Sequence, residues 1–294
     1  MLIARLIAET SECETRLDAL SGALAAAGVP LIAAAMPEGD ASVLELHLED
    51  GDVAAVLAAI DTAFEAPAML VARESIEVPK LFVSDMDSTM IGQECIDELA
   101  DYAGIKAQIA EITERAMQGE LDFEAALRER VALLAGLDES AIGTCLAERI
   151  TATPGAKTLV ATLAALGTRT VLVTGGFHHF ADPVAEMLGF HRVVGNRLEV
   201  EGEKLTGGLV GPITDSAVKA AVLREEIAML GEGIHSLATG DGANDIPMIE
   251  AATYGFAYRA KPKARAAANG RVDSMDLTAV LTLLGVPQED WRDG

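Results

Sequence analysis

The chain has little cysteine, few aromatic residues and few basic residues. Among its 294 residues there are three cysteines, and aromatic side chains make up 4%. Cys13, Cys95 and Cys145 have neither a paired nor a C-x-x-C spacing, which argues against a disulfide framework and against a zinc site. A hydrophobic fraction of 50% is still ample for a buried core, filled by Ala, Leu, Val and Ile. The cysteine usage fits a reducing compartment, and we expect a cytoplasmic protein.

Long hydrophobic runs are also missing, and the charge is strongly of one sign. No apolar run approaches the roughly 18 residues that span a bilayer. Lys and Arg number 22 against 46 Asp and Glu, which gives a formal net charge of −24. Such a surface repels nucleic acid and anionic membranes, so we expect neither as a partner. Phosphorylated metabolites are repelled too, so a site for one must supply its own local cations.

Residues 1–75 predict a small α+β domain that is separate from the rest of the chain. The expected elements follow the order β-α-β-β-α-β, which is the ferredoxin-like split arrangement. This order resembles the ACT-like modules that precede some enzymes of amino-acid metabolism. A dimerising role, giving a homodimer through this domain, and a role in sensing an amino acid remain alternatives. The expected strands, helices and turn are 2–8, 12–27, 31–36, the turn 37–40, 43–48, 53–64 and 69–72.

Residues 80–294 predict an α/β domain with a Rossmann-like parallel sheet. Short apolar strands alternate with helical segments, which is typical of a parallel sheet with helices on both faces. A helical stretch of about 92–150 follows the first strand and is longer than a connection needs. We expect it to form a cap over the carboxyl end of the sheet, where ligands bind in open α/β folds. The expected strands are 81–83, 170–173, 234–239 and 254–258.

The first chemical motif is Asp85-Met86-Asp87-Ser88-Thr89, directly after the strand Leu81-Phe82-Val83. Two carboxylates this close raise each other's pKa unless a cation lies between them. Mg²⁺ prefers hard oxygen ligands and would fit there. One carboxylate can then attack phosphorus to give an aspartyl phosphate, and the other can donate and accept the proton.

Three further segments suit a phosphate site. Thr174-Gly175-Gly176 ends another strand, and its glycines let backbone N–H groups approach a phosphate. Lys219 lies near a helix start and can supply the cation that a chain of this charge needs. Gly240-Asp241-Gly242-Ala243-Asn244-Asp245 ends a third strand: Asp241 is placed to bind Mg²⁺, and Asp245 to orient a metal-bound water or Lys219.

Together these four ordered motifs resemble those of the haloacid-dehalogenase-like (HAD) phosphatases. The resemblance implies that Asp85 is the nucleophile, that Asp87 is the general acid and base, and that Asp245 has a supporting role. It implies that Mg²⁺ is held by Asp85, the Asp87 carbonyl and Asp241. The residues that it implies for phosphate binding are Thr174, Gly175, Lys219 and Asn244.

The predicted cap narrows the resemblance to the phosphoserine phosphatase family. The segments that carry it are 90–98, 117–123 and 127–131. The resemblance implies that Glu94 and Arg130 bind the amino-acid part of the substrate, with Met117 and Phe123 closing over it. A carboxylate and a guanidinium match the ammonium and the carboxylate of a free amino acid.

The resemblance therefore implies a Mg²⁺-dependent phosphatase for O-phospho-L-serine, a small-molecule substrate. It would act through an aspartyl phosphate and release L-serine and phosphate, the last step of serine biosynthesis. One alternative is a phosphatase or phosphotransferase for another small phosphorylated metabolite, against which Glu94 and Arg130 argue. The other is an amino-acid-sensing binding protein with a vestigial catalytic domain, against which the intact Asp85, Asp87, Lys219 and Asp241 argue.

Overall fold

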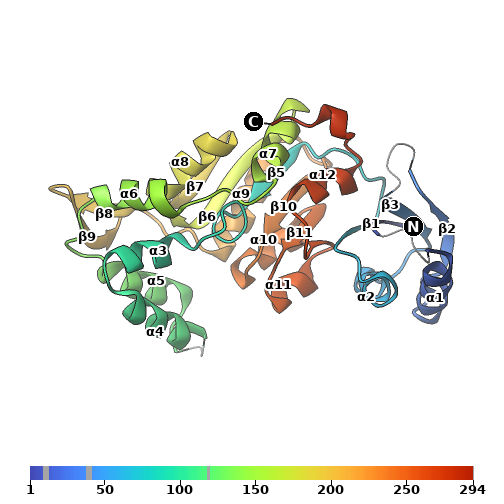
Figure 1. Ribbon diagram of the computed structural model, residues 1–294, viewed down its shortest axis with the longest axis horizontal. Helices are drawn as coiled ribbons and strands as arrows, with labels where there is room; N and C mark the ends of the chain where they lie inside the picture. Colours follow the sequence, from blue (N-terminus) through green and yellow to red (C-terminus); the bar gives the residue numbers. More distant parts are fainter. Residues whose placement is uncertain (9–12, 38–41, 118–119, 294) are drawn as a thin grey trace.

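A ten-stranded mixed sheet is the central element of the fold, and a helical cap lies at one end of the protein (Figure 1). The computed structural model describes residues 1–8, 13–37, 42–117 and 120–293, with the backbone alone at Ala116 and Met117. The strands are β1 (Leu2–Ile7), β2 (Leu31–Ala35), β3 (Val43–Leu48), β4 (Ala68–Ala72), β5 (Leu81–Ser84), β6 (Arg169–Phe177), β7 (Arg192–Asn196), β8 (Leu198–Glu201), β9 (Lys204–Leu209), β10 (Ser236–Gly240), β11 (Tyr254–Tyr258) and β12 (Gly270–Val272). The helices are α1 (Cys13–Ala26), α2 (Val53–Phe64), α3 (Cys95–Tyr102), α4 (Lys106–Met117), α5 (Phe123–Ala132), α6 (Ser140–Arg149), α7 (Ala156–Ala165), α8 (His178–Leu188), α9 (Ser216–Leu230), α10 (Ile246–Ala251), α11 (Pro262–Ala267) and α12 (Thr278–Leu284).

The N-terminal part has the predicted split arrangement. Its strands lie in the order β2-β3-β1-β4, and every neighbouring pair is antiparallel. Helices α1 and α2 bury Leu24 and Ile60 against alternate residues of these strands, such as Leu6 and Leu46. The ferredoxin-like order is therefore confirmed, whereas the ACT-like sensing role stays a prediction. The predicted turn 37–40 lies mostly outside the described residues.

The larger part is built on a parallel sheet in the order β12-β11-β10-β5-β6-β7. Side chains of a strand alternate between the two faces. Phe82 of β5 packs in the cluster that includes α7, α8 and α12, while Leu81 and Val83 pack against α9 and α10. Because β5 lies between β10 and β6, the carboxyl ends of these three strands meet at one edge of the sheet.

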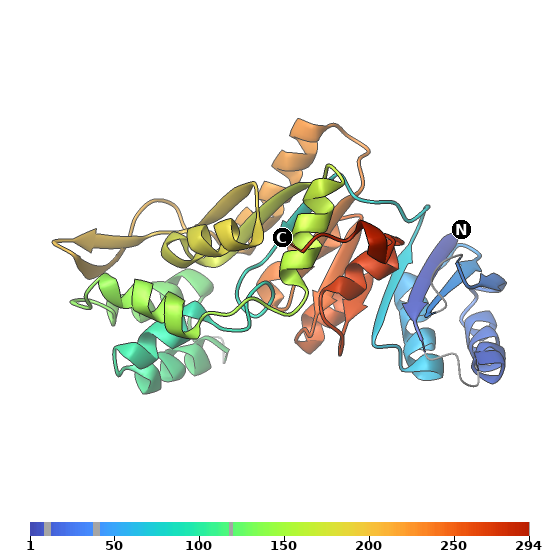
Figure 2. The same cartoon turned by 45° about the horizontal axis from the view of Figure 1, so that its top comes forward.

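The cap consists of α3 to α6, inserted between β5 and α7, as predicted (Figure 2). Two hinge segments join it to the sheet, and they pair through an isolated bridge between Ile91 and Ala152. The hairpin β8–β9, which lies beside the cap, was not predicted. Strands β7 and β12 and helices α11 and α12 were also not predicted. These elements are short, so hydrophobic periodicity has too few residues to reveal them.

The two parts of the chain share one sheet. Strand β4 pairs antiparallel with β12, the outer strand of the parallel part, with Leu70 opposite Gly270. Beside this junction, Asp61 of α2 forms ion pairs with Arg271 of β12 (2.6 Å) and Arg265 of α11 (3.1 Å). Arg265 also pairs with Asp273 at 2.8 Å. The division into residues 1–75 and 80–294 stays a prediction, and the continuous sheet indicates that the two parts stabilise each other.

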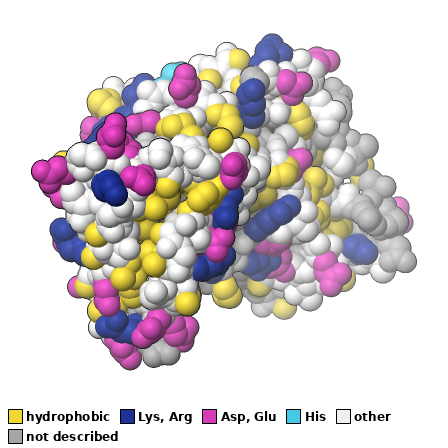
Figure 3. All heavy atoms as spheres, turned by 60° about the vertical axis from the view of Figure 1, so that its left-hand side comes forward, with side chains coloured by type: hydrophobic (Ala, Val, Ile, Leu, Met, Phe, Trp, Pro, Cys, Tyr) yellow, Lys and Arg dark blue, Asp and Glu magenta, His cyan; other side chains and the backbone are white. Residues whose placement is uncertain are grey.

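The surface bears on the expected partners. In the view from the cap end, Lys and Arg side chains are interspersed with Asp and Glu (Figure 3). No helix in the described part of the chain is long and apolar enough to cross a membrane. Strand β2 is one of the two edge strands of the sheet and carries an exposed Ile32. The prediction of a homodimer through residues 1–75 can be tested by measuring the molar mass with light scattering.

The junction gives a stability prediction. Arg271 is 6% exposed, so Asp61→Asn removes the partner of a buried guanidinium. We expect the free energy of unfolding, measured with urea, to fall by about 2 kcal/mol. The control is Asp50→Asn, whose pair with Arg73 has side chains 72% and 63% exposed and should contribute much less. Equal losses in both variants would contradict a stabilising role for the junction.

Candidate active site

The site begins at the carboxyl end of β5, where Asp85 enters a buried loop. Its Oδ1 atom accepts the N–H of Met86 at 2.8 Å. The same oxygen lies 2.7 Å from Nζ of Lys219. Within the described residues, these contacts leave Oδ2 of Asp85 without a protein donor. One oxygen is therefore fixed by the protein, and the other remains free to react or to bind a cation.

Lys219 links the first and fourth motifs. It lies in the first turn of α9, which begins after Asp215, whose side chain accepts the N–H of Val218 at 2.9 Å. Its Nζ atom lies 2.7 Å from both Asp85 Oδ1 and Asp245 Oδ1. Burial alone would lower the pKa of Lys219, yet the charges of Asp85 and Asp245 raise it. The ammonium therefore stays charged, although its side chain is 1% exposed.

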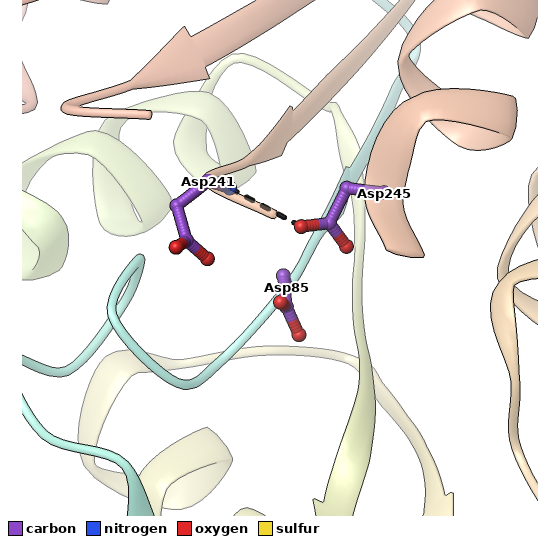
Figure 4. A group of neighbouring side chains, drawn as sticks. All are labelled: Asp85, Asp241 and Asp245. Atoms are coloured by element: carbon purple, nitrogen blue, oxygen red, sulfur yellow. Dashed lines mark hydrogen bonds between the residues drawn. The ribbon is translucent and has the colours of Figure 1, made fainter. Parts of the chain in front are cut away.

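Asp241 and Asp245 come from the loop after β10 and approach Asp85. Ligand atoms of these three carboxylates all lie within 4.8 Å of one another. The second oxygen of Asp245 accepts the N–H groups of Asp241 (3.2 Å) and Gly242 (3.0 Å). Figure 4 shows these three side chains near one another, with one oxygen of Asp245 hydrogen-bonded to the Asp241 backbone. Because both Asp245 oxygens are occupied, Asp85 and Asp241 are the better ligands for a metal.

The carboxylates of the site carry perturbed pKa values. Burial raises the pKa of Asp85 well above its ordinary value, the charge of Asp245 adds to this, and Lys219 opposes it. Burial also raises the pKa of Asp241. Burial and then the charge of Glu94 raise the pKa of Asp87 to about 7. Asp87 can therefore give up and take back a proton at neutral pH, as a general acid and base must.

The carboxyl end of β6 forms a second wall. Thr174 is buried, and its Oγ1 accepts the N–H of Gly176 at 2.8 Å. A Cβ atom at Gly176 would lie 2.8 Å from Oδ2 of Asp87, so a larger residue there would displace the Asp87 carboxylate. The carbonyl of Gly175 accepts the side-chain amide of Asn196 at 2.7 Å. These contacts fix the backbone of this segment beside the carboxylates.

The cap completes the pocket over these strand ends. The cavity measures about 120 Å³. Phe123 of α5 lies over Gly175, because a Cβ atom there would be 3.3 Å from its ring. The predicted site residues that line the cavity are Asp85, Asp87, Glu94, Phe123, Arg130, Thr174, Gly175, Asp241 and Asn244.

Two of the remaining predicted residues lie behind the cavity, and one cannot be placed. Lys219 and Asp245 are buried, and they contact the lining residues Asp85 and Asp241. The side chain of Met117 lies outside the described residues. Burial lowers the pKa of Arg130, while the charges of Asp97 and Glu94 oppose this, and a guanidinium stays charged in either case.

Sequence reasoning assigned no site role to several residues that lie at or beside the cavity, among them Lys261 and Ser88. Lys261 lines the cavity, and its Nζ lies 3.4 Å from Oδ2 of Asp241. The only signal for it was its position just after strand β11. Gly176 was predicted to let the backbone approach a phosphate, but its close approach to Asp87 was not predicted. Ser88, inside the first motif, donates a hydrogen bond to Oε1 of Glu94 at 2.7 Å.

The sequence was compared with known protein families and with proteins of known activity. The family model described as haloacid dehalogenase-like hydrolase matches residues 82–250. A phosphoserine phosphatase of Streptococcus thermophilus is 45% identical over 209 residues, which are 71% of this chain and 97% of that protein. A phosphoserine phosphatase of Streptomyces coelicolor is also 45% identical, over 72% of this chain and 52% of that protein. The chain thus spans about half the length of the second relative.

A solved structure extends the similarity to the N-terminal part. The probable phosphoserine phosphatase of Vibrio cholerae, in unliganded form, superimposes with a TM-score of 0.73 at 29% identity. The superposition covers 98% of this chain and 87% of that one. The family model spans more than half of the chain, and its residues include the β5 and β10 loops. The chain belongs to the haloacid dehalogenase-like hydrolases, among the relatives of the phosphoserine phosphatases.

Proposed function

We propose that the chain is a phosphatase that hydrolyses O-phospho-L-serine to L-serine and phosphate, with Mg²⁺ as its cofactor. The observation that carries the proposal is that Glu94 and Arg130 of the cap line the same cavity as Asp85 and Asp87. They offer an anion and a cation to the ammonium and carboxylate of an amino acid, beside a nucleophile and an acid. The similarity to phosphoserine phosphatases supports this assignment, which makes the reaction the last step of serine biosynthesis.

The first half of the reaction transfers the phosphoryl group to the protein. Oδ2 of Asp85 attacks phosphorus, and the bond between phosphorus and the serine oxygen breaks. Asp87 gives its proton to that oxygen, so the leaving group departs as the serine hydroxyl. A pKa of about 7 keeps a large fraction of Asp87 protonated at neutral pH. Lys219, held against Oδ1, stabilises the negative charge around Asp85.

The second half releases phosphate and restores the protein. Asp87, now ionised, takes a proton from a water molecule that attacks phosphorus. The bond between phosphorus and Oδ2 of Asp85 breaks, and the carboxylate is regenerated. Thr174 keeps its hydroxyl proton free for a phosphate oxygen, because its Oγ1 accepts the Gly176 N–H. Phe123, over Gly175, helps to exclude other water from the intermediate.

The donor set suits Mg²⁺. Asp85 and Asp241 offer carboxylate oxygens, and burial raises the pKa of both. This is the situation that a bound cation relieves, and hard oxygen donors favour Mg²⁺. The Asp87 backbone carbonyl would complete the protein ligands. When bound, the ion would neutralise negative charge on the carboxylates and the phosphate.

Asp85→Asn should lower phosphoserine turnover by at least a thousandfold, because an amide is a poor nucleophile and the uncatalysed reaction is very slow. Asp87→Asn keeps the nucleophile but loses the proton carrier, so a phosphorylated protein should accumulate. Phosphate release and the mass of the intact protein measure the two effects. Normal turnover in either variant, with an unchanged circular dichroism spectrum, would remove that residue from its role.

Addition of Mg²⁺ should raise the thermal unfolding midpoint of the wild type, because a ligand that binds only the folded state stabilises it. Asp241→Asn should abolish most of this shift, whereas Asp18→Asn, on the exposed side of α1, should retain it. Ca²⁺ should support turnover poorly, because it prefers a larger and looser coordination shell. An unchanged Mg²⁺ shift in Asp241→Asn would contradict the metal assignment.

Arg130→Ala should lower kcat/KM for phosphoserine about a hundredfold or more, because a charged recognition partner is lost. Phosphoethanolamine has no carboxylate, so its kcat/KM should fall much less in Arg130→Ala. Glu94→Gln should lower kcat/KM for both substrates, since both carry the ammonium. An aryl phosphate should be affected least by either change.

The matched control for these substrates is Arg128→Ala on the same helix. Arg128 is exposed and pairs with Glu124 at 2.8 Å. This control should leave all three kcat/KM values near those of the wild type. Equal losses on all three substrates in Arg130→Ala and Glu94→Gln would show that these residues only support the fold. The phosphoserine assignment would then rest on the similarity to phosphoserine phosphatases alone.

A further inference from the structure

The hydrogen bond between Ser88 and Glu94 connects the nucleophile loop with the first residue of the cap. Ser88 Oγ donates to Oε1 of Glu94 at 2.7 Å. The turn between them is closed by a second bond, from the N–H of Ser88 to the carbonyl of Gln93 at 3.2 Å. The serine hydroxyl therefore occupies one carboxylate oxygen of Glu94 and leaves the other for a ligand in the cavity.

The backbone of Ser88 makes the choice of serine informative. Its φ angle is +53°, in the left-handed region where residues other than glycine are uncommon. Glycine would adopt this conformation without steric cost. A serine at a position that suits glycine indicates that the hydroxyl has a use. Its only hydrogen bond as a donor within the described residues is the one to Glu94.

Glu94 is free to serve the cavity because another residue caps its helix. Glu94 is the N-cap of α3, but its side chain makes no capping hydrogen bond. The N–H of Cys95, the first residue of α3, instead donates to Oδ1 of Asp87 at 3.2 Å. The Glu94 side chain is exposed at the mouth of the cavity, so without Ser88 it would sample several rotamers. Fixing such a side chain only when the ligand binds would cost affinity.

We propose that Ser88 is a positioning residue, which holds the Glu94 carboxylate in the orientation that receives the substrate ammonium. The inference rests on the proposed function and assigns substrate specificity to a residue of the nucleophile loop. Ser88 acts through Glu94 and has no part in phosphoryl transfer. Its removal should therefore appear in KM for substrates that carry an ammonium, more than in kcat.

The test compares Ser88→Ala and Ser88→Gly with the wild type on three substrates. We expect both variants to raise KM about 10-fold for phosphoserine and for phosphoethanolamine, since a hydrogen bond to a charged group is lost. The change for an aryl phosphate should be several-fold smaller. In a Glu94→Ala background, Ser88→Ala should add no further loss, because its acceptor is already absent.

Two comparisons separate positioning from a structural role. Ser88→Gly removes the backbone strain as well as the hydroxyl. If Ser88 had only a backbone role, the glycine variant would keep or lower the wild-type KM. The matched control is Ser75→Ala, which removes another serine-to-glutamate bond, to Glu77 at 3.0 Å, outside the cavity. It should leave KM for all three substrates near the wild-type values.

The outcomes are distinct. A phosphoserine KM for Ser88→Gly equal to that of the wild type would overturn the inference. Equal KM increases on all three substrates, or an additive effect with Glu94→Ala, would overturn it as well. Failure of the wild type to turn over phosphoserine, while it hydrolyses the aryl phosphate, would instead overturn the proposed function.

Discussion

The buried ammonium of Lys219 is the contact on which the rest of the site depends. Three carboxylates gather within 4.8 Å in a chain whose net charge is −24. Buried like charges are costly unless a cation pairs with them. Lys219 contacts both Asp85 and Asp245, at 2.7 Å each, and Asp245 in turn holds the loop after β10. One interaction thus joins Asp85, the proposed nucleophile, to the loop that carries Asp241.

Most of the residues that the sequence assigns to one site do line one cavity, because they follow the ends of neighbouring parallel strands. Asp85, Thr174 and Asp241 are far apart in the chain, yet β5, β6 and β10 end at one edge of the sheet. The pairing of β4 with β12 has no such local signal, since a strand's pattern does not reveal which edge it joins. Lys261 and the bond from Ser88 were missed for a related reason: loop geometry, not periodicity, brings them to the cavity.

The cap is hydrogen-bonded to Asp87, the proposed general acid. Asp87, the proposed proton carrier, accepts the N–H of the first residue of α3. The hinge segments behind it are joined reciprocally: Gln93 donates to Thr151 Oγ1 at 2.9 Å and accepts the Thr151 N–H at 3.0 Å. A shift of the cap therefore alters the hydrogen bonding of Asp87 as well as the position of Glu94. The position of the cap and the hydrogen bonding of Asp87 are therefore linked through the first residue of α3.

Charge balance in the cavity gives an independent argument for a divalent cation. Its lining includes the carboxyl groups of Asp85, Asp87, Glu94 and Asp241, against the cations of Arg130 and Lys261. Lys219, beneath the lining, is already shared by Asp85 and Asp245, and Lys261 lies against Asp241. Arg130 is needed for the substrate carboxylate if the proposed function holds. A phosphate dianion would then enter a site with no uncommitted positive charge among the described lining residues. An added cation of high charge, held by oxygen ligands, would make such a site attractive to the proposed substrate.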